Sequence, residues 1–360
     1  MTTATATATT LTTTAIDYTE MVLVDANAVF PEVVPNAGER QVKMRKHRHQ
    51  DCLPSNPDYI PDEGIFGTVF AWQQAPRQPR PLGLVGETGT GKTEMALYLA
   101  DRLNLPLRVV KVTPGLTAAM LEGGYELVTD NGQVVSRRVY GAAVKAYRDG
   151  GILLLDEVDK CSDDLATALH LLVEGKPWSL ESFGGEVVMK HTQCYIITTS
   201  NTTGEGGHIR YTSSRKMDAA LRSRIGWLQT AYPPKEHEVR ILSKKYPKLP
   251  TGLVMDLVET ANDCRDLVLG PNRDGHIDDP IGGVFSTRVL VDWGFYIMAF
   301  GLKKPLRASL DFVFSGSLDE ADGEPVKAAL QRRWADKLDL PLGDLLKVYA
   351  PSQAASAPKP

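Results

Sequence analysis

The sequence predicts an α/β fold built on a parallel sheet and followed by a small, all-helical domain. Residues 82–85 are a short, mainly apolar run that leads through a glycine-rich loop into a helix-like pattern at 94–103. Residues 151–155 are a second run without a polar side chain, as expected for a strand that is buried on both faces of a parallel sheet. Beyond Pro233 the patterns are helical throughout.

Composition and charge agree with a folded globular protein. The chain has 360 residues, of which 42% are hydrophobic and 23% charged, so it can bury one large core or two modest ones. A formal net charge of −4 excludes the global basic field that by itself drives binding to nucleic acid. The four cysteines are scattered without C-x-x-C spacing, and no apolar run approaches the roughly 18 residues of a membrane span. We therefore expect reduced thiols, no membrane contact and a cytoplasmic location.

The loop after the first apolar run fits the spacing G-x-x-x-x-G-K-[ST]. Small residues let backbone N–H groups surround phosphate oxygens, and the start of the following helix adds partial positive charge. Lys92 is expected to reach the β- and γ-phosphates of ATP, and Thr93 to hold Mg²⁺ through its hydroxyl. The loop supplies eight candidate nucleotide-binding residues: Gly86, Glu87, Thr88, Gly89, Thr90, Gly91, Lys92 and Thr93.

Two further strands end in polar residues. The run at 151–155 leads into Asp156 and Glu157, at the edge where open α/β sheets bind ligands. Asp156 is expected to support Mg²⁺, and Glu157 to orient or deprotonate the attacking water. The strand-like run at 194–201 ends in Asn201, which is placed to contact the γ-phosphate or that water.

Changes in composition divide the chain into five parts. They are a disordered Thr-rich tail at 1–20, a flank at 21–75, the nucleotide-binding domain at 76–232, the helical domain at 233–335 and a C-terminal tail at 336–360. Within the flank, 21–34 predicts a short strand or docked segment, and 64–74 a docking helix. The basic run at 43–49 favours a solvated linker; contact with nucleic acid or an acidic partner is the alternative.

The nucleotide-binding domain contains two expected insertions. Residues 126–136 alternate around Asn131-Gly132, the strongest short signal for a hairpin, and precede a helical pattern at 139–147. Residues 180–190 predict a second hairpin. Insertions of this kind usually serve partners or substrates.

Three arginines are candidates for contact with the nucleotide. Arg222 and Arg224 close the nucleotide-binding domain, and an arginine near such a core acts on the nucleotide of a neighbouring subunit in some ATPases. Arg288, near the start of a helix in the helical domain, is expected to reach a nucleotide lying between the two domains.

The succession of motifs resembles the AAA+ ATPases, and within them the MoxR-like group that includes the CobS-type ATPase subunit of cobaltochelatase. The motifs are GETGTGKT at 86–93, LLLDE at 153–157, TTSN at 198–201, ALRSR at 220–224 and FSTR at 285–288. The resemblance implies a P-loop AAA+ core with a helical lid, and a homo-oligomeric, hexameric ring. It also implies that Asn201 is sensor 1, Arg224 the arginine finger with Arg222 beside it, and Arg288 sensor 2, and that the two hairpins line a central pore.

The same resemblance implies that ATP hydrolysis acts on a partner protein. One candidate partner is a CobT-type protein with a von Willebrand factor A (VWA) domain, working with a chelatase subunit; another is a different client of a MoxR-like chaperone, including one on a phage or mobile element. A nucleic-acid motor is supported only by the run at 43–49. A switch that binds ATP without hydrolysing it would have no need for Glu157.

Overall fold

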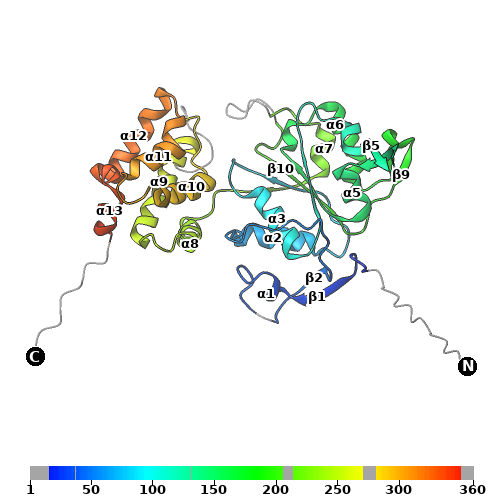
Figure 1. The fold of residues 1–360 in the computed structure, drawn as a ribbon, viewed down its shortest axis with the longest axis horizontal. Coiled ribbons are helices and arrows are strands. Elements are labelled where there is room, and N and C mark those ends of the chain that lie inside the picture. Colours follow the sequence, from blue (N-terminus) through cyan, green and yellow to red (C-terminus); the bar gives the residue numbers. More distant parts are fainter. Residues whose placement is uncertain (1–15, 37, 131, 206–213, 271–280, 350–360) are drawn as a thin grey trace, which may run out of the picture.

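The core of the protein is a five-stranded parallel sheet (Figure 1). The computed structural model describes residues 16–349 except 37, 131, 206–213 and 271–280. From one edge to the other, the strands are β11 (Gly226–Gln229), β3 (Leu82–Val85), β10 (Cys194–Ser200), β7 (Gly151–Asp156) and β4 (Leu107–Lys111). Every neighbouring pair is parallel, which confirms the predicted fold class. Because β10 lies between β3 and β7, the three strands with expected catalytic residues are adjacent.

Helices cover both faces of this sheet. Alternate residues of β7 point to opposite sides, so that Ile152 belongs to one hydrophobic cluster and Leu153 to the other. The first cluster packs against α3 (Lys92–Arg102) and α2 (Glu63–Gln73). The second is formed with α5 (Ala142–Asp149), α6 (Asp163–Glu174) and α7 (Ala219–Arg224). The expected docking helix of the flank is therefore part of the nucleotide-binding core.

The basic run at 43–49 differs from the expected linker. The antiparallel strands β1 (Met21–Asp25) and β2 (Gln41–Arg45) pair here, with the short helix α1 (Ala26–Val29) after β1. Arg45 is only 2% exposed, and its Nε donates to Gln193 Oε1 at 2.7 Å. Lys46 and Arg48 form ion pairs with Glu20 and Asp101. The interpretation as a solvated linker is wrong because Arg45 and Arg48 fasten the flank to the core. Glu20, expected in the disordered tail, is paired with Lys46.

Both hairpin insertions are present and lie next to each other (Figure 1). The short helix α4 (Ala118–Glu122) leads into β5 (Gly123–Asp130), which pairs with β6 (Gln133–Tyr140). The second hairpin is β8 (Trp178–Leu180) and β9 (Glu186–Val188), and its Glu186 accepts hydrogen bonds from Arg138 and Tyr140 of the first. Asn131 of the expected turn lies outside the described residues.

The helix expected at 139–147 begins later than predicted. Val139 pairs with Gly124 and Tyr140 with Gly123, so both residues belong to the hairpin. Gly141 follows against the backbone of the preceding helix, where an added Cβ would lie 2.2 Å from Leu121 O. The chain turns at this glycine, and the helix starts at 142.

The C-terminal part is a separate helical body, joined to the sheet by the segment after β11 (Figure 1). Its helices are α8 (Lys235–Lys245), α9 (Thr251–Leu269), α10 (Thr287–Phe300), α11 (Leu306–Val313), α12 (Glu320–Trp334) and α13 (Leu342–Val348). Leu338, Leu342 and Leu345 are buried in its hydrophobic cluster. The tail expected from 336 is therefore wrong for the residues up to 349, because they complete this core. None of the described helices is both long and apolar enough to cross a membrane.

Replacing Leu345 tests whether α13 belongs to the helical body. Leu345 is 0% exposed, so Leu345→Ala leaves a cavity and should lower the free energy of unfolding by about 2 to 5 kcal/mol. Val348 on the same helix is 54% exposed, and Val348→Ala is the matched control. Thermal unfolding measures both. Equal, small shifts in melting temperature would contradict the placement of α13.

Candidate nucleotide-binding site

The glycine-rich loop has the backbone shape that a phosphate-binding loop requires. Gly89 and Gly91 have φ values of 77° and 86°, in the left-handed region that other residues rarely adopt. Gly91 precedes α3 without a side-chain cap, so the first N–H groups of that helix face the loop. Gly86 is packed so closely that an added Cβ would lie 2.1 Å from Thr230 O. The loop thus leaves donors for an anion and allows no side chain at this position.

Lys92 lies folded back over this loop. Its Nζ donates to Gly86 O at 2.7 Å, to Glu87 O at 2.8 Å and to Asn201 Oδ1 at 3.2 Å. Burial lowers the pKa of the Lys92 ammonium to about 8. A phosphate beside this amine would favour its charged form. The structure therefore brings together two residues, Lys92 and Asn201, that the sequence places 109 positions apart.

Thr93 and Asp156 meet at the carboxyl edge of the sheet. The Thr93 hydroxyl lies 3.4 Å from Asp156 Oδ1, which also accepts a hydrogen bond from Thr199 of β10. A hydroxyl and a carboxylate are oxygen ligands of the kind that Mg²⁺ takes, with phosphate and water completing its shell. In the described part of the chain no group of three or more His, Cys, Asp or Glu residues could hold a metal. The two oxygens therefore fit a nucleotide-bound Mg²⁺ rather than a metal held by protein alone.

Glu157 has a strained backbone and a paired carboxylate. Its φ of 61° lies in the left-handed region, a conformation that costs about 1 to 2 kcal/mol for a residue with a Cβ. Burial alone would raise the pKa of its carboxyl, but the hydrogen bonds and charges of Lys160 and Lys111 outweigh it and lower that pKa. The carboxylate lies 3.0 Å from Lys160 Nζ and 3.3 Å from Lys111 Nζ. In this state it is held by lysines rather than turned into the pocket.

Asp159 was not recognised from the sequence as part of the site. It is almost fully buried, and its Oδ2 accepts from the backbone N–H of Asn201 and from the hydroxyls of Thr202 and Ser214. This carboxylate anchors the end of β10, and thereby positions Asn201 beside Lys92. Asp159 comes two residues after the Asp156-Glu157 pair, and that spacing gave no signal of the contact.

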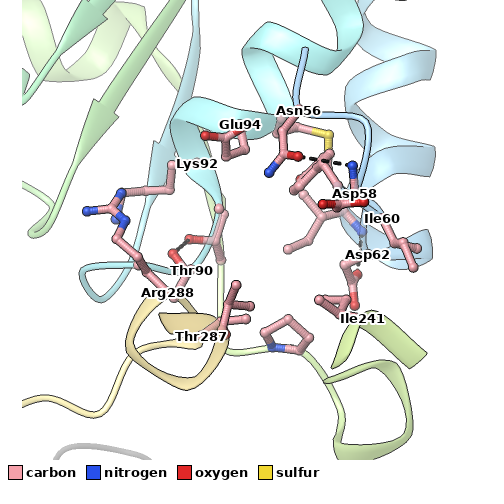
Figure 2. A pocket seen from close by; sticks show the side chains of 18 of the residues that line it. Asn56, Asp58, Ile60, Asp62, Thr90, Lys92, Glu94, Ile241, Thr287 and Arg288 are labelled. Carbon is pink, nitrogen blue, oxygen red and sulfur yellow. Dashed lines mark hydrogen bonds between the residues drawn. The ribbon is translucent and has the colours of Figure 1, made fainter. Parts of the chain in front are cut away.

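A pocket of about 260 Å³ opens beside the loop, between the sheet domain and the helical body. Figure 2 shows its walls, which come from the loop, the helical body, the flank and the segment that follows β11. The loop contributes Thr90 and Lys92, the helical body contributes Ile241 and Arg288, and the flank contributes residues of the range 56–65. The exposed Arg288 extends from α10 toward the side of the loop where Lys92 lies (Figure 2). The contribution of the flank to the pocket was not predicted because nothing in its sequence indicates contact with a ligand.

The other two candidate arginines lie outside this pocket. Arg224, at the end of α7, donates from Nε to Glu174 Oε1 at 2.5 Å and from a terminal nitrogen to Ala220 O. Arg222 is on the same short helix, and its carbonyl accepts from Trp227. Within one chain, the structure brings Arg288 to the nucleotide pocket and does not bring Arg222 or Arg224 there.

The fold and this pocket define a P-loop nucleotide-binding protein, and comparison with known proteins gives its family. A family model described as an AAA domain (dynein-related subfamily) matches residues 81–225. The denitrification regulatory protein NirQ of Stutzerimonas stutzeri is 32% identical over 217 residues, which are 59% of this chain and 73% of NirQ. Protein CbbQ of Hydrogenophilus thermoluteolus is 28% identical over 69% of this chain and 85% of its own. Protein NorQ of Paracoccus denitrificans is 28% identical over 59% of this chain and 73% of NorQ.

The chain therefore belongs to the MoxR-like AAA+ ATPases, as its motifs indicated. It is accordingly an ATP hydrolase, which excludes a role restricted to nucleotide binding.

Substitutions in the site separate binding from hydrolysis. Lys92→Ala should abolish ATP binding because it removes the cation over the phosphate loop. Glu157→Gln should leave binding intact and lower kcat by about 10²-fold to 10⁴-fold, the usual contribution of a general base. Calorimetry with ATP and a phosphate-release assay measure the two effects, with the surface variant Glu324→Gln as control. If both site variants lost binding equally, the assigned roles would be refuted.

Proposed function

We propose that the protein hydrolyses ATP-Mg²⁺ in a homo-oligomeric ring and uses the energy to remodel or regulate a partner protein. The observation that carries the proposal is the meeting of Lys92 with Asn201, and of Thr93 with Asp156, at the carboxyl edge of the sheet. Phosphoryl transfer to water requires a phosphate-binding loop, oxygen atoms that bind the metal ion and a polar residue directed at the γ-phosphate.

Each residue of the site has a distinct proposed role. The loop 86–93 binds the phosphates, Thr93 and Asp156 hold Mg²⁺, and Arg288 contacts the nucleotide from the helical body. Glu157 activates the attacking water after its carboxylate leaves Lys111 and Lys160. Movement of this side chain is required because it is paired with the lysines in the present arrangement.

The position of Arg224 supports the proposed ring. Its guanidinium lies near the molecular surface against Glu174, outside the chain's own nucleotide pocket. An arginine in such a position stabilises the transferring phosphoryl group only if it is supplied to a neighbouring copy. A closed ring gives every site such a neighbour, and the resemblance to the MoxR-like group favours six copies with Arg222 beside the shared arginine.

The partner is proposed to contact the first hairpin, β5–β6. Its apolar side chains are unusually exposed, with Leu127 76% and Val134 70% accessible. The second hairpin adds Val187 and Met189, which are also exposed. In a ring, these side chains would face a shared channel and make apolar contacts with a polypeptide in it. The name of NirQ, a denitrification regulatory protein, fits a regulatory role, and the CobT-like VWA-domain protein is the specific partner we propose.

A nucleic-acid motor has less support. Arg45 of the basic run is buried against Gln193, and Lys46 and Arg48 are paired with carboxylates, which reduces the charge that the run can offer to phosphate groups. The proposal accordingly commits to a protein as the partner.

Mixing two inactive variants tests the shared site. Arg224→Ala should bind ATP but lose hydrolysis, because its arginine is missing from the neighbour's site. Subunits with Glu157→Gln keep that arginine. Mixed rings should recover part of the wild-type phosphate release, since some sites then combine an intact Glu157 with an intact Arg224 from the next copy. Absence of any recovery in rings shown to be mixed would argue against the arrangement in trans.

Affinity capture with Glu157→Gln identifies the partner. In ATP this variant should remain in its bound state and retain its client, whereas Lys92→Ala, which does not bind ATP, should release it. Mass spectrometry of the proteins captured only by the first variant is the measurement. Recovery of a VWA-domain protein with a chelatase subunit supports the CobT-like partner, and a different client overturns that choice but keeps the remodelling function.

A further inference from the structure

A tyrosine in the connecting segment joins the nucleotide loop to the helical body. The segment after β11 runs along the loop, where the Thr230 hydroxyl lies 3.0 Å from that of Thr90 and the Thr230 N–H donates to Val85 O at 2.6 Å. Two residues further, the hydroxyl of Tyr232 donates to Thr88 O at 2.8 Å. The Tyr232 ring itself is buried in the hydrophobic cluster of the helical body. One side chain therefore belongs to both parts of the protein.

The ring of Tyr232 packs against a fully buried ion pair. The guanidinium of Arg265 lies 4.2 Å from the centre of the ring and makes two hydrogen bonds of 2.7 Å to Glu238. Its Nε donates to Phe285 O, and Glu238 also accepts from the Thr287 hydroxyl at 2.7 Å. Both charged groups are 0% exposed. A pair buried in this way is costly to break, so it holds the backbone of its partners in place.

These partners enclose the start of α10, the helix that carries Arg288. Phe285 and Thr287 stand on either side of Ser286, whose hydroxyl caps the helix. Ser286 also touches the nucleotide loop, since a Cβ added to Gly89 would lie 2.4 Å from the Ser286 Cβ. The first turn of α10 is thus fixed to the ion pair on one side and rests on the loop on the other.

We propose that Tyr232 is a positioning residue that, through the buried Glu238–Arg265 pair, holds Arg288 over the nucleotide loop. Through the same contacts, a change in the conformation of the loop is transmitted to the helical body. The inference rests on the proposed contact of Arg288 with the nucleotide. A displacement of Thr88 when the loop closes on phosphate moves the Tyr232 hydroxyl, and the ring moves the ion pair and the start of α10 with it.

Tyr232→Phe tests this connection because it removes only the hydroxyl and leaves the ring on Arg265. We expect the KM for ATP to rise by between about twofold and tenfold, the usual effect of one hydrogen bond. Tyr147→Phe is the matched control, since the buried Tyr147 hydroxyl also donates to a carbonyl, Lys176 O, and neither residue lines the nucleotide pocket. The control should lower the melting temperature without changing the KM.

A double-mutant cycle shows whether Tyr232 acts through Arg288. In an Arg288→Ala background, Tyr232→Phe should cause no further rise in KM, because the residue that it positions is gone. A rise in the double variant equal to the product of the two single effects would overturn the inference, as would a Tyr232→Phe protein with the KM of the wild type.

Substitutions of Thr287 test the same network from the side of Glu238. Thr287→Val removes the hydroxyl that binds Glu238 and should raise the KM in the same way, whereas Thr287→Ser keeps that hydroxyl and should restore the wild-type value. Equal KM values for the two variants would contradict the proposed network. Wild-type protein that neither bound nor hydrolysed ATP would instead refute the proposed function itself.

Discussion

The order of the strands is the constraint on which the site depends. Because β10 lies between β3 and β7 in parallel register, the carboxyl ends of three strands from distant parts of the chain meet at one edge. Lys92 then lies beside Asn201, and Thr93 beside Asp156. A different order, with β10 at an edge of the sheet, would separate it from β3 or from β7, so that either the contact of Lys92 with Asn201 or that of Asp156 with the Thr199 hydroxyl would be lost.

Much of this arrangement could be predicted because its signals are local. The glycines at 86, 89 and 91 and the run that ends in Asp156 each need particular residue types in particular backbone shapes, so their spacing shows in the sequence. That these segments lie close together could be predicted from the general rule that open α/β sheets bind ligands at the carboxyl ends of their strands. The roles given to these residues stay proposals, although the geometry fits them.

Other features depend on contacts between distant segments, and these leave no local pattern. Arg45 looks like part of a solvated basic run until the fold brings Gln193 beside it. Leu345 lies in a weakly amphipathic stretch near the end of the chain, and its burial becomes visible only when the other helices are in place. Asp159 likewise resembles an ordinary acid after a strand, because its partners at 201, 202 and 214 are far along the sequence.

The pocket is walled by two bodies that have separate hydrophobic cores, and this has a thermodynamic consequence. A ligand held between them contributes part of its binding free energy to keeping them together. The coupling is reciprocal, so a load that pulls the helical body away from the sheet weakens nucleotide binding by the same factor by which the nucleotide resists the pull. Separation of the two bodies and release of the nucleotide are, in this geometry, two sides of one equilibrium.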